Sequence, residues 1–222
     1  MRKLILAIVC LAALGLVPGA GFAQSANSLL LSQPAEPAAP VLDGKTLDPP
    51  HTSATFWIRH IVAPVAGRFD ATAGVIDIPA KDPAKGHVAF TVQTKSVDTG
   101  VAARDKHLNT PEFLDTANYP EMKFASERIV AAGKGVYTVT GKLTIKDVTK
   151  TVSIPVQYLG AKPNPMMPCV DASGYEAHLS LNRLDYHVGT GKYFKMGAVG
   201  DMVDIRLAGE TLAKRPGCVK GE

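Results

Sequence analysis

The chain has 222 residues, of which 46% are hydrophobic and 20% are charged, and its formal net charge is +4. This length fits one or two domains, and this balance is typical of a globular protein, which excludes a disordered or collagen-like chain. The small net charge gives no electrostatic argument for binding nucleic acid or an anionic bilayer.

The N-terminus has the pattern of a cleaved secretory signal. Arg2 and Lys3 precede an unbroken apolar run over residues 4–17, and the site Gly21-Phe22-Ala23 follows. This run is short for spanning a bilayer, so we expect a signal peptide over residues 1–23 and no membrane-spanning segment. Residues 24–42, rich in Ala, Ser, Gln and Pro, are expected to form a flexible linker. The sequence therefore predicts an exported protein whose folded domain covers residues 43–222.

Period-two alternation of apolar and polar residues dominates the rest of the chain and predicts half-buried strands. Lys146-Asp147 leaves almost no spacer between two of these strands and predicts a tight hairpin. Pro155 lacks a backbone donor, so it is expected at an edge, at a bulge or with its nitrogen pointing outward. The proline-rich residues 161–174 are expected to form an insertion loop. The predicted strands cover residues 54–62, 87–95, 135–145, 148–158, 175–182 and 202–207.

One region departs from period two. Residues 101–108 have helical spacing, and Thr110-Pro111-Glu112 then supplies an N-cap, a proline at the first helical position and an acid near the helix N-terminus. We therefore expect two short helical pieces in an otherwise all-β, antiparallel chain. Periodicity alone leaves a β-sandwich and a closed barrel open. The small size of many inward-facing residues favours an interior cavity.

Two cysteines, Cys169 and Cys218, remain once Cys10 leaves with the signal peptide. An oxidising compartment and an even count favour a disulfide between them. Two free thiols, or a bridge to another chain, are the alternatives. The chain has no Cys-x-x-Cys motif, so redox catalysis is not expected.

The most specific motifs follow one another along the chain at residues 96–100 (SVDTG), 104–108 (RDKHL), 111–115 (PEFLD) and 119–120 (YP). Supporting motifs lie at residues 51–53, 59–60, 67–69, 141–145, 148–150, 181–183 and 199–201. From about residue 47 to residue 212, these ordered motifs resemble the YceI-like family of periplasmic, lipocalin-like barrels that bind polyisoprenoid lipids. The resemblance implies an antiparallel β-barrel of about eight strands with a short helical segment near one end.

The chain departs from the family pattern at three places. Asp147 stands where the family hairpin has glycine, and we expect it to adopt the left-handed backbone conformation that Asp tolerates. Residues 161–174 and 186–198 also differ from the usual pattern. If they flank the barrel mouth, the choice of ligand would differ from that of typical members.

The resemblance implies that an isoprenoid lipid, of the quinone or polyprenyl type, lies inside the barrel, with no other cofactor. Trp57 faces opposite to Phe56 and Ile58, so it is expected outside the lining set, where it could serve a membrane or partner contact. Leu108 and Phe113 lie on the helical segment and could face the pocket or act as a lid. The residues expected to contact the ligand are Phe56, Ile58, Phe69, Phe90, Val92, Leu108, Phe113, Phe124, Val139, Leu143, Leu179 and Leu181.

Arg104, Asp105 and His107 are the polar residues expected at the barrel mouth. One interpretation gives them helix capping and salt bridges, and the other makes them a polar collar around a ligand head group. The six histidines are scattered without metal-ligand spacing, and no G-x-S-x-G nucleophile motif occurs, so neither a metal nor a catalytic residue is expected.

The leading functional hypothesis is a non-enzymatic, periplasmic protein that holds an isoprenoid lipid for carriage, storage or stress response. One alternative is an enzyme that acts on a fatty or amide substrate through the polar collar. Another is an adaptor protein whose barrel is filled by its own side chains. A homodimer stays open, and a nucleic-acid partner is not expected.

Overall fold

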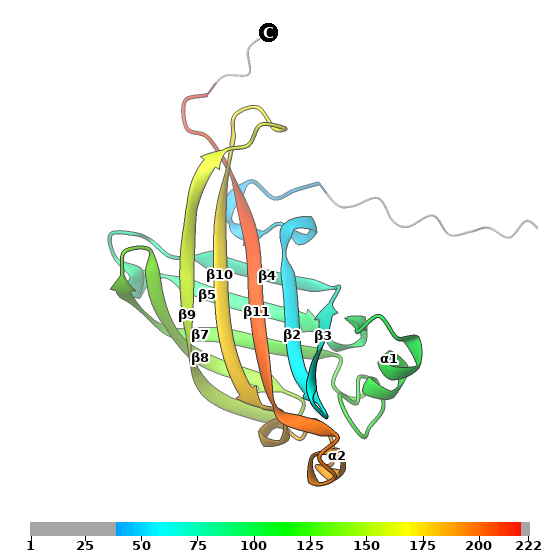
Figure 1. Ribbon diagram of the computed structural model, residues 1–222. Coiled ribbons are helices and arrows are strands. Elements are labelled where there is room, and N and C mark those ends of the chain that lie inside the picture. Colours follow the sequence, from blue (N-terminus) through cyan, green and yellow to red (C-terminus); the bar gives the residue numbers. More distant parts are fainter. Residues whose placement is uncertain (1–38, 219–222) are drawn as a thin grey trace, which may run out of the picture. The chain divides into compact units, whose positions relative to one another are not determined.

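The computed structural model describes residues 39–218 (Figure 1). The predicted signal peptide over residues 1–23 and most of the predicted linker, residues 24–38, lie outside the described residues, as do residues 219–222. Residues 39–218 belong to one compact unit. Within residues 39–218, no helix is long and apolar enough to cross a bilayer.

Strands make up most of this unit, and the helices between them are short. The helices are α1 (Ala102–Leu108), α2 (Lys192–Lys195) and the single-turn helices η1 (Pro49–His51), η2 (Pro83–Lys85), η3 (Thr94–Ser96) and η4 (Arg183–Tyr186). The strands are β1 (Asp43–Leu47), β2 (Ser53–His60), β3 (Ala63–Phe69), β4 (Thr72–Asp77), β5 (His87–Gln93), β6 (Val97–Asp98), β7 (Glu121–Gly133), β8 (Val136–Ile145), β9 (Val148–Pro163), β10 (Val170–Asn182) and β11 (Val199–Lys214).

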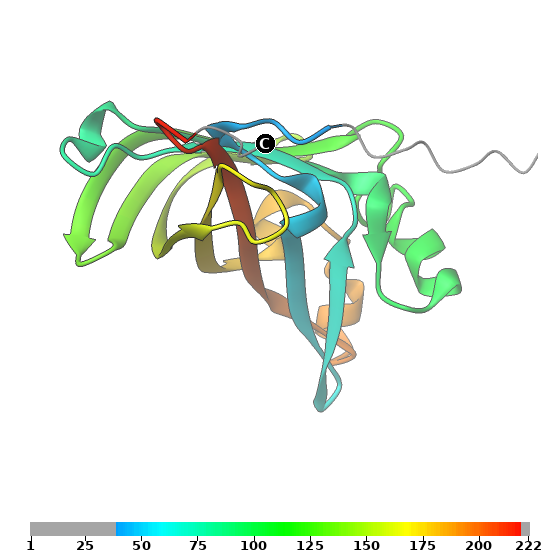
Figure 2. The same ribbon diagram turned by 90° about the horizontal axis from the view of Figure 1, so that it is seen from above.

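Eight of these strands close into an antiparallel barrel (Figures 1 and 2). They follow one another in the order β1-β4-β5-β7-β8-β9-β10-β11, and β1 pairs back with β11 where Leu47 lies opposite Thr211. Strands β2, β3 and β6 continue the sheet from β11 as an extension. Closure pairs the backbone groups that an open edge would leave exposed. The predicted fold class, an eight-stranded antiparallel barrel with a short helix near one end, is confirmed.

Pro155 lies where the pairing between two long strands ends. Strand β9 pairs with β10 from Pro163 opposite Asp171 to Val156 opposite Ala177. This ladder ends at Val156, the neighbour of Pro155 in the sequence, and does not include Pro155. On its other side Pro155 lies opposite Thr138 of β8. Pro155 therefore lies in an interior strand, not in an edge strand, at the end of the β9–β10 ladder.

The connection between β9 and β10 is shorter than expected. Strand β9 extends to Pro163 and β10 begins at Val170, so the predicted insertion loop over residues 161–174 is reduced to residues 164–169. The disulfide between Cys169 and Cys218 is present, with a Cα–Cα distance of 5.4 Å. It joins this loop to the segment that follows β11, where Arg215 also binds Asp171 at 2.6 Å.

The helix α1 is found as predicted, but the prediction of a second helical piece is wrong. Residues 110–119 form turns. The carbonyl oxygen of Thr110 accepts hydrogen bonds from the amides of both Phe113 and Asp115, and Asp115 adopts a φ of 49°. The chain therefore leaves the helical path after a single turn, because a left-handed residue cannot continue a right-handed helix.

The β8–β9 hairpin is as tight as predicted, since Ile145 pairs with Val148. The expectation about its backbone is wrong, however, because the residue with positive φ is Lys146, at 53°, and not Asp147. The left-handed backbone conformation therefore falls on Lys146, the first residue of the turn.

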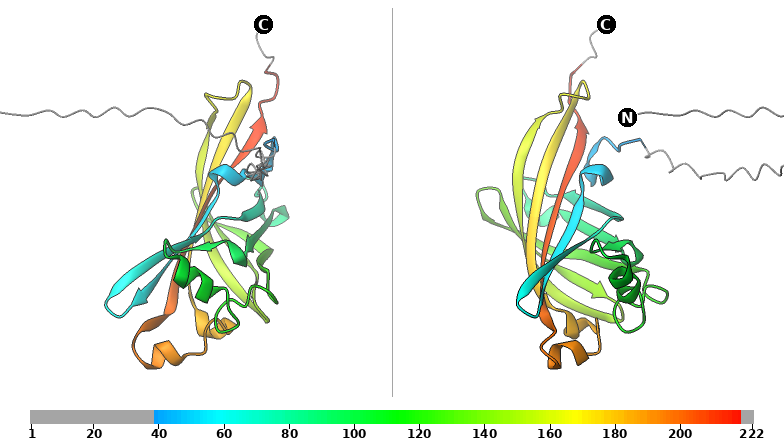
Figure 3. Two further views of the ribbon diagram at one scale, coloured as in Figure 1. Left: turned by 90° about the vertical axis from the view of Figure 1, so that its right-hand side faces the viewer. Right: turned by 45° about the vertical axis from the view of Figure 1, so that its right-hand side comes forward.

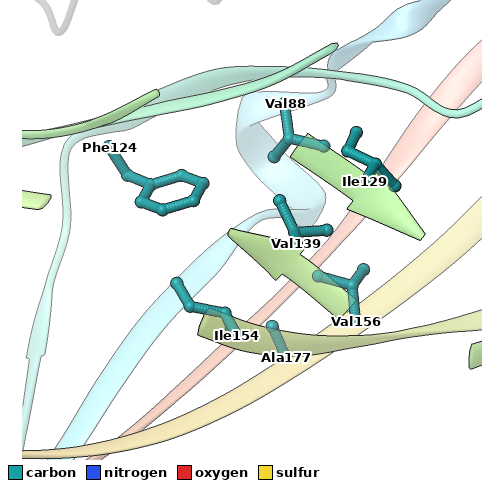
Figure 4. Packing of buried hydrophobic residues seen from close by; sticks show 7 residues of the cluster. All are labelled: Val88, Phe124, Ile129, Val139, Ile154, Val156 and Ala177. Carbon is teal, nitrogen blue, oxygen red and sulfur yellow. The ribbon is translucent and has the colours of Figure 1, made fainter. Parts of the chain in front are cut away.

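A compact hydrophobic cluster fills one part of the barrel interior (Figure 4). Its side chains come from β5, β7, β8, β9 and β10 and point toward one another, as alternation along each strand requires. The rest of the interior lies beyond this cluster. The cluster consists of Val88, Phe124, Ile129, Val139, Ile154, Val156 and Ala177.

Candidate functional site

A cavity of about 610 Å³ occupies the remaining interior of the barrel. Its wall is almost entirely apolar, because the inward-facing side chains of the alternating strands form it. The cavity reaches the end of the barrel where α1 and α2 lie, since His107 of α1 and Met196, just after α2, belong to its wall and are also exposed. We call this end the mouth.

The residues expected to contact a ligand all belong to the wall of this cavity. Phe124 and Val139 are also buried members of the hydrophobic cluster. That these residues contact a ligand stays a prediction. The full set is Phe56, Ile58, Phe69, Phe90, Val92, Leu108, Phe113, Phe124, Val139, Leu143, Leu179 and Leu181.

Trp57 lies outside the wall. It pairs with Asp204 of β11 and Ala66 of β3, and its side chain is 36% exposed on the outer surface. This matches the expectation from alternation, because its neighbours Phe56 and Ile58 both face inward.

The segment over residues 186–198 flanks the mouth, and it contributes wall residues that were not predicted individually. Tyr186 and Val188 line the cavity on one side of α2, and Tyr193, Met196 and Ala198 line it within and after α2. The sequence pointed to this segment only because residues 186–198 depart from the family pattern. A segment that varies at the mouth can alter ligand choice without changing the barrel.

Arg104 and Asp105 hold the loop that precedes α1. The Arg104 Nε donates to Thr99 Oγ1 at 2.7 Å, and an Nη donates to the Thr99 carbonyl at 2.8 Å. Asp105 accepts from the Thr99 backbone amide at 3.0 Å and from its hydroxyl group. Arg104 belongs to the cavity wall and Asp105 does not. That these residues surround a ligand head group stays a prediction. The Asp105 carboxylate is used locally to fix Thr99.

His107 takes part in a small cluster at the mouth. Its Nε2 lies 2.8 Å from a carboxylate oxygen of Glu112, and its ring packs edge-on against Phe113, with 5.0 Å between ring centroids. Phe113 stacks in turn on Tyr193, at 5.9 Å. The cluster joins α1, the turns that follow it and α2, and it forms one side of the opening.

Lys146 connects the two segments around the mouth, and sequence reasoning did not identify it. Its Nζ donates to the carbonyl oxygen of Phe113 at 2.9 Å and to that of His187 at 2.7 Å. These partners lie 33 and 41 residues away in the chain. No local pattern in the sequence could reveal such contacts.

Arg183 is the most buried cation of the cavity wall, with 4% of its surface exposed. Its Nε donates to the Gly200 carbonyl at 2.8 Å and Nη1 donates to the Val188 carbonyl at 2.7 Å, whereas Nη2 has no hydrogen-bond partner. Burial lowers the pKa of this guanidinium, and the charge of nearby Asp201 opposes that shift. Arg183 thus fixes the segment that leads from η4 to β11.

Several histidines bind carboxylates. His51 lies 2.6 Å from Asp48, which raises its pKa, and His178 lies 2.7 Å from Glu176. Within residues 39–218, no group of three or more His, Cys, Asp or Glu side chains could hold a metal ion. What this part of the chain offers is therefore an apolar cavity with a few cationic groups near its opening.

Comparison with known proteins agrees with this architecture. The chain is 31% identical to a protein named YceI from Escherichia coli O17:K52:H18 over 166 residues, which cover 74% of this chain and 83% of that one. It is 31% identical to a UPF0312 protein from Vibrio campbellii over 150 residues, which cover 66% of this chain and 78% of the relative.

Solved structures show the same barrel. BcnA of Burkholderia cenocepacia matches with a TM-score of 0.67 at 25% identity, over 74% of this chain and 99% of that one. A polyisoprenoid-binding domain from Saccharophagus degradans, implicated in plant cell wall breakdown, matches with a TM-score of 0.55 at 17% identity, over 78% of this chain and 99% of that domain. The model of the YceI-like domain covers residues 46–211, and the chain therefore belongs to the YceI-like family.

Proposed function

We propose that this protein is a non-enzymatic lipid-binding protein that holds an isoprenoid lipid, of the quinone or polyprenyl type, in its barrel. The observation that carries the proposal is the apolar cavity of about 610 Å³. This volume lies within the range of about 300–1,000 Å³ that is common for small-molecule sites. The Saccharophagus degradans domain, which has the same barrel, is a polyisoprenoid-binding domain.

Burial of hydrocarbon supplies the affinity. Each CH₂ group moved from water into an apolar wall contributes about 0.8 kcal/mol, so a chain-like lipid needs few directional contacts. Arg104 and His107 line the wall near the mouth, which supports a role for them in orienting a polar head group. The head group would then lie toward the opening and the tail toward Phe124 and Val139.

The structure favours binding over the two alternatives. An enzyme that used the collar would need Arg104, Asp105 and His107 to converge on one substrate atom. Instead, Arg104 and Asp105 bind Thr99, and His107 binds Glu112. An adaptor with a filled barrel would lack an interior space of this size.

The proposed place of action is the periplasm. The support is the N-terminal pattern of Arg2 and Lys3, an apolar run and Gly21-Phe22-Ala23. Expression in a Gram-negative host followed by osmotic-shock fractionation tests it. We expect the protein in the periplasmic fraction with a mass that corresponds to a chain starting at Gln24. Recovery of the uncleaved chain from the cytoplasm would overturn the assignment.

Ligand extraction tests the proposed function directly. Protein purified from its host is extracted with organic solvent, and the extract is analysed by mass spectrometry for isoprenoid lipids. Leu179→Trp should lower the amount of bound lipid about tenfold, because the indole would occupy the cavity that Leu179 lines. His178→Trp is the matched control, since His178 is the neighbouring outward-facing residue on β10 and is exposed.

Both variants must first show the circular dichroism spectrum of the wild type. Lipid in the wild type and in His178→Trp, with little in Leu179→Trp, is the expected result. No isoprenoid lipid in the wild type, together with no uptake of added prenyl lipid after refolding, would end the proposal.

A further inference from the structure

Large apolar side chains are exposed around the mouth of the cavity. Ile61 and Val62 form the turn between β2 and β3, and Val62 is 88% exposed. Phe194 and Met196 are exposed on and just after α2, and Met196 is 67% exposed although it also lines the cavity. We call these four residues the rim.

The fold places the two halves of the rim together. The backbone amide of Ile61 donates to the carbonyl oxygen of Ala198 at 2.9 Å, which ties the β2–β3 turn to the segment after α2. In both views of Figure 3, this turn and α2 lie at the same end of the barrel. The loop over residues 164–169 lies at the other end (Figures 1 and 3). His60, which precedes Ile61 in the chain, and Ala198, which accepts this hydrogen bond, both line the cavity.

The two segments that contain the rim carry cations and no carboxylate of their own, whereas Asp147 binds His187, Glu112 binds His107 of the mouth cluster, and Asp185 and Asp201 lie just outside the segments. Residues 59–66 and 187–200 carry Arg59, Lys192 and Lys195, all exposed, and no Asp or Glu. The net charge of the whole chain is only +4 and does not reveal the excess of cations over carboxylates within these two segments. Exposed apolar side chains beside Lys and Arg are the combination that favours insertion into the interface of an anionic bilayer.

We propose that the rim docks onto an anionic lipid bilayer and brings the mouth of the cavity against the membrane surface. The rim consists of a tight turn and a four-residue helix, which are protruding shapes that can enter a head-group layer. A second copy of the chain is a poorer occupant. A two-fold interface would place the rims and their cations against each other, where like charges repel.

This docking gives the proposed lipid binding a route of entry, since an insoluble ligand could pass from bilayer to cavity without crossing water. The docking itself does not depend on an occupied cavity. It is therefore measured on vesicles that contain no isoprenoid lipid.

The test uses flotation with vesicles of phosphatidylcholine, with or without phosphatidylglycerol. Trp57 is the only tryptophan in the chain and lies on the outer surface of β2, so its emission should shift to the blue when the protein docks. We expect binding to the anionic vesicles that weakens in high salt. The double variant Val62→Glu/Phe194→Glu, at two rim residues that do not belong to the cavity wall, should lose at least about tenfold in vesicle binding.

Met166→Glu is the matched control, because Met166 is 86% exposed in the loop at the opposite end. It should bind vesicles as the wild type does. Lys192→Glu/Lys195→Glu should abolish the preference for phosphatidylglycerol. All variants share the same N-terminus, so differences between them report the rim.

Three results would overturn the proposal. These are no binding of the wild type to anionic vesicles, equal binding of the wild type and the rim variant, and a concentration-dependent dimer in sedimentation that the rim variant abolishes. The outcome is separable from the proposed function. The rim variant should take up prenyl lipid that is added during refolding while losing vesicle binding, whereas Leu179→Trp should fail to take up that lipid while retaining vesicle binding.

Discussion

Lys146 illustrates how one side chain can hold the opening of a barrel in shape. It lies in a tight turn with a φ of 53°, and its Nζ binds the carbonyl oxygens of Phe113 and His187. Those two residues belong to the two segments that flank the mouth. A cation that satisfies two carbonyls from different segments restricts both of them at once.

Replacing this cation should loosen the mouth and leave the barrel intact. In Lys146→Met, the segments over residues 110–119 and 184–191 lose a shared partner. We expect their amide hydrogen exchange to accelerate about tenfold, since a hydrogen bond to a charged group contributes about 1.5–3 kcal/mol. Hydrogen-exchange mass spectrometry of peptides from both segments measures the change.

Lys142→Met is the control for that experiment. Lys142 lies on β8 near the same hairpin, but its Nζ binds Thr151 on the neighbouring strand. It should leave exchange in both mouth segments unchanged. If Lys146→Met also left that exchange unchanged, the connecting role of Lys146 would be wrong.

The sequence predicts the positions of some side chains in the fold and not of others. Alternation along a strand decides which side chains face inward, and this is why Phe56, Ile58 and the other predicted lining residues on strands belong to the cavity wall, whereas Leu108 and Phe113 reach it from α1 and the turns that follow. The carboxylate of Asp105 binds Thr99, six residues earlier, a contact that helical spacing alone did not predict. Lys146 was missed because its partners are distant in the sequence.

At the scale of elements, the corner between β1 and β2 closes the barrel at β11. The backbone amide of Asp48 donates to the Glu210 carbonyl at 2.8 Å, and the Thr52 hydroxyl donates to the Asp48 carbonyl at 2.8 Å. The buried Asp48 carboxylate binds His51 at the end of η1. This ion pair therefore fixes the corner from which both strands depart.

The corner should make stability depend on pH. The hydrogen bond to Asp48 raises the pKa of His51 above its ordinary value of 6.5. A raised pKa in the folded state means that folding favours the protonated form, so the contribution is complete below about pH 6.5 and is lost as the pH rises through the folded-state pKa. Because His51 is exposed to solvent, we expect about 0.5 kcal/mol.

Urea unfolding of the wild type and of His51→Gln at a series of pH values measures this contribution. The free energies of unfolding should differ most at acidic pH and converge at alkaline pH. A difference that is constant with pH, or that grows as the pH rises, would contradict the assignment. His178→Gln serves as a comparison for a histidine on an open strand surface.

Elements were predictable where alternation was unbroken. Strands β2, β5, β8, β9, β10 and β11 follow it, whereas β1, β3, β4, β6 and β7 were not identified. In β7 the register shifts between Ser126 and Arg128, so the inward-facing Phe124 and Ile129 are five positions apart, an odd number. Such a bulge changes the phase of the pattern. The second helical piece failed for a related reason, because the cap signal of Thr110-Pro111-Glu112 does not reveal the positive φ of Asp115.

For the molecule as a whole, the two ends of the barrel have different construction. The mouth combines short helices, turns and exposed apolar side chains. The opposite end is held by the disulfide between Cys169 and Cys218 and by the ion pair of Arg215 with Asp171. Closure of the ring through β1 and β11 joins residues near the two ends of the folded unit, a pairing that periodicity alone could not distinguish from a sandwich.

This division predicts that removal of the disulfide changes stability without changing ligand binding. The bridge spans a sequence separation of 49 residues, for which the loss of chain entropy in the unfolded state corresponds to about 4 kcal/mol. Neither cysteine belongs to the cavity wall. Cys169→Ser/Cys218→Ser should therefore lower the free energy of unfolding by about 2–4 kcal/mol.

Guanidinium unfolding of the oxidised wild type and of the double variant measures the stability, and solvent extraction of the same samples measures the bound lipid. Equal stability of the two proteins would show that the bridge adds no constraint beyond the pairing of β10 with β11. Loss of lipid from a folded double variant would show that the two ends of the barrel are coupled. Local unfolding near Val170, at the disulfide end, would then have been transmitted to the cavity along the long strands. We expect neither, since the β10–β11 ladder continues without a register shift from Val170 to Asn182 and holds the cavity wall whether or not the bridge is closed.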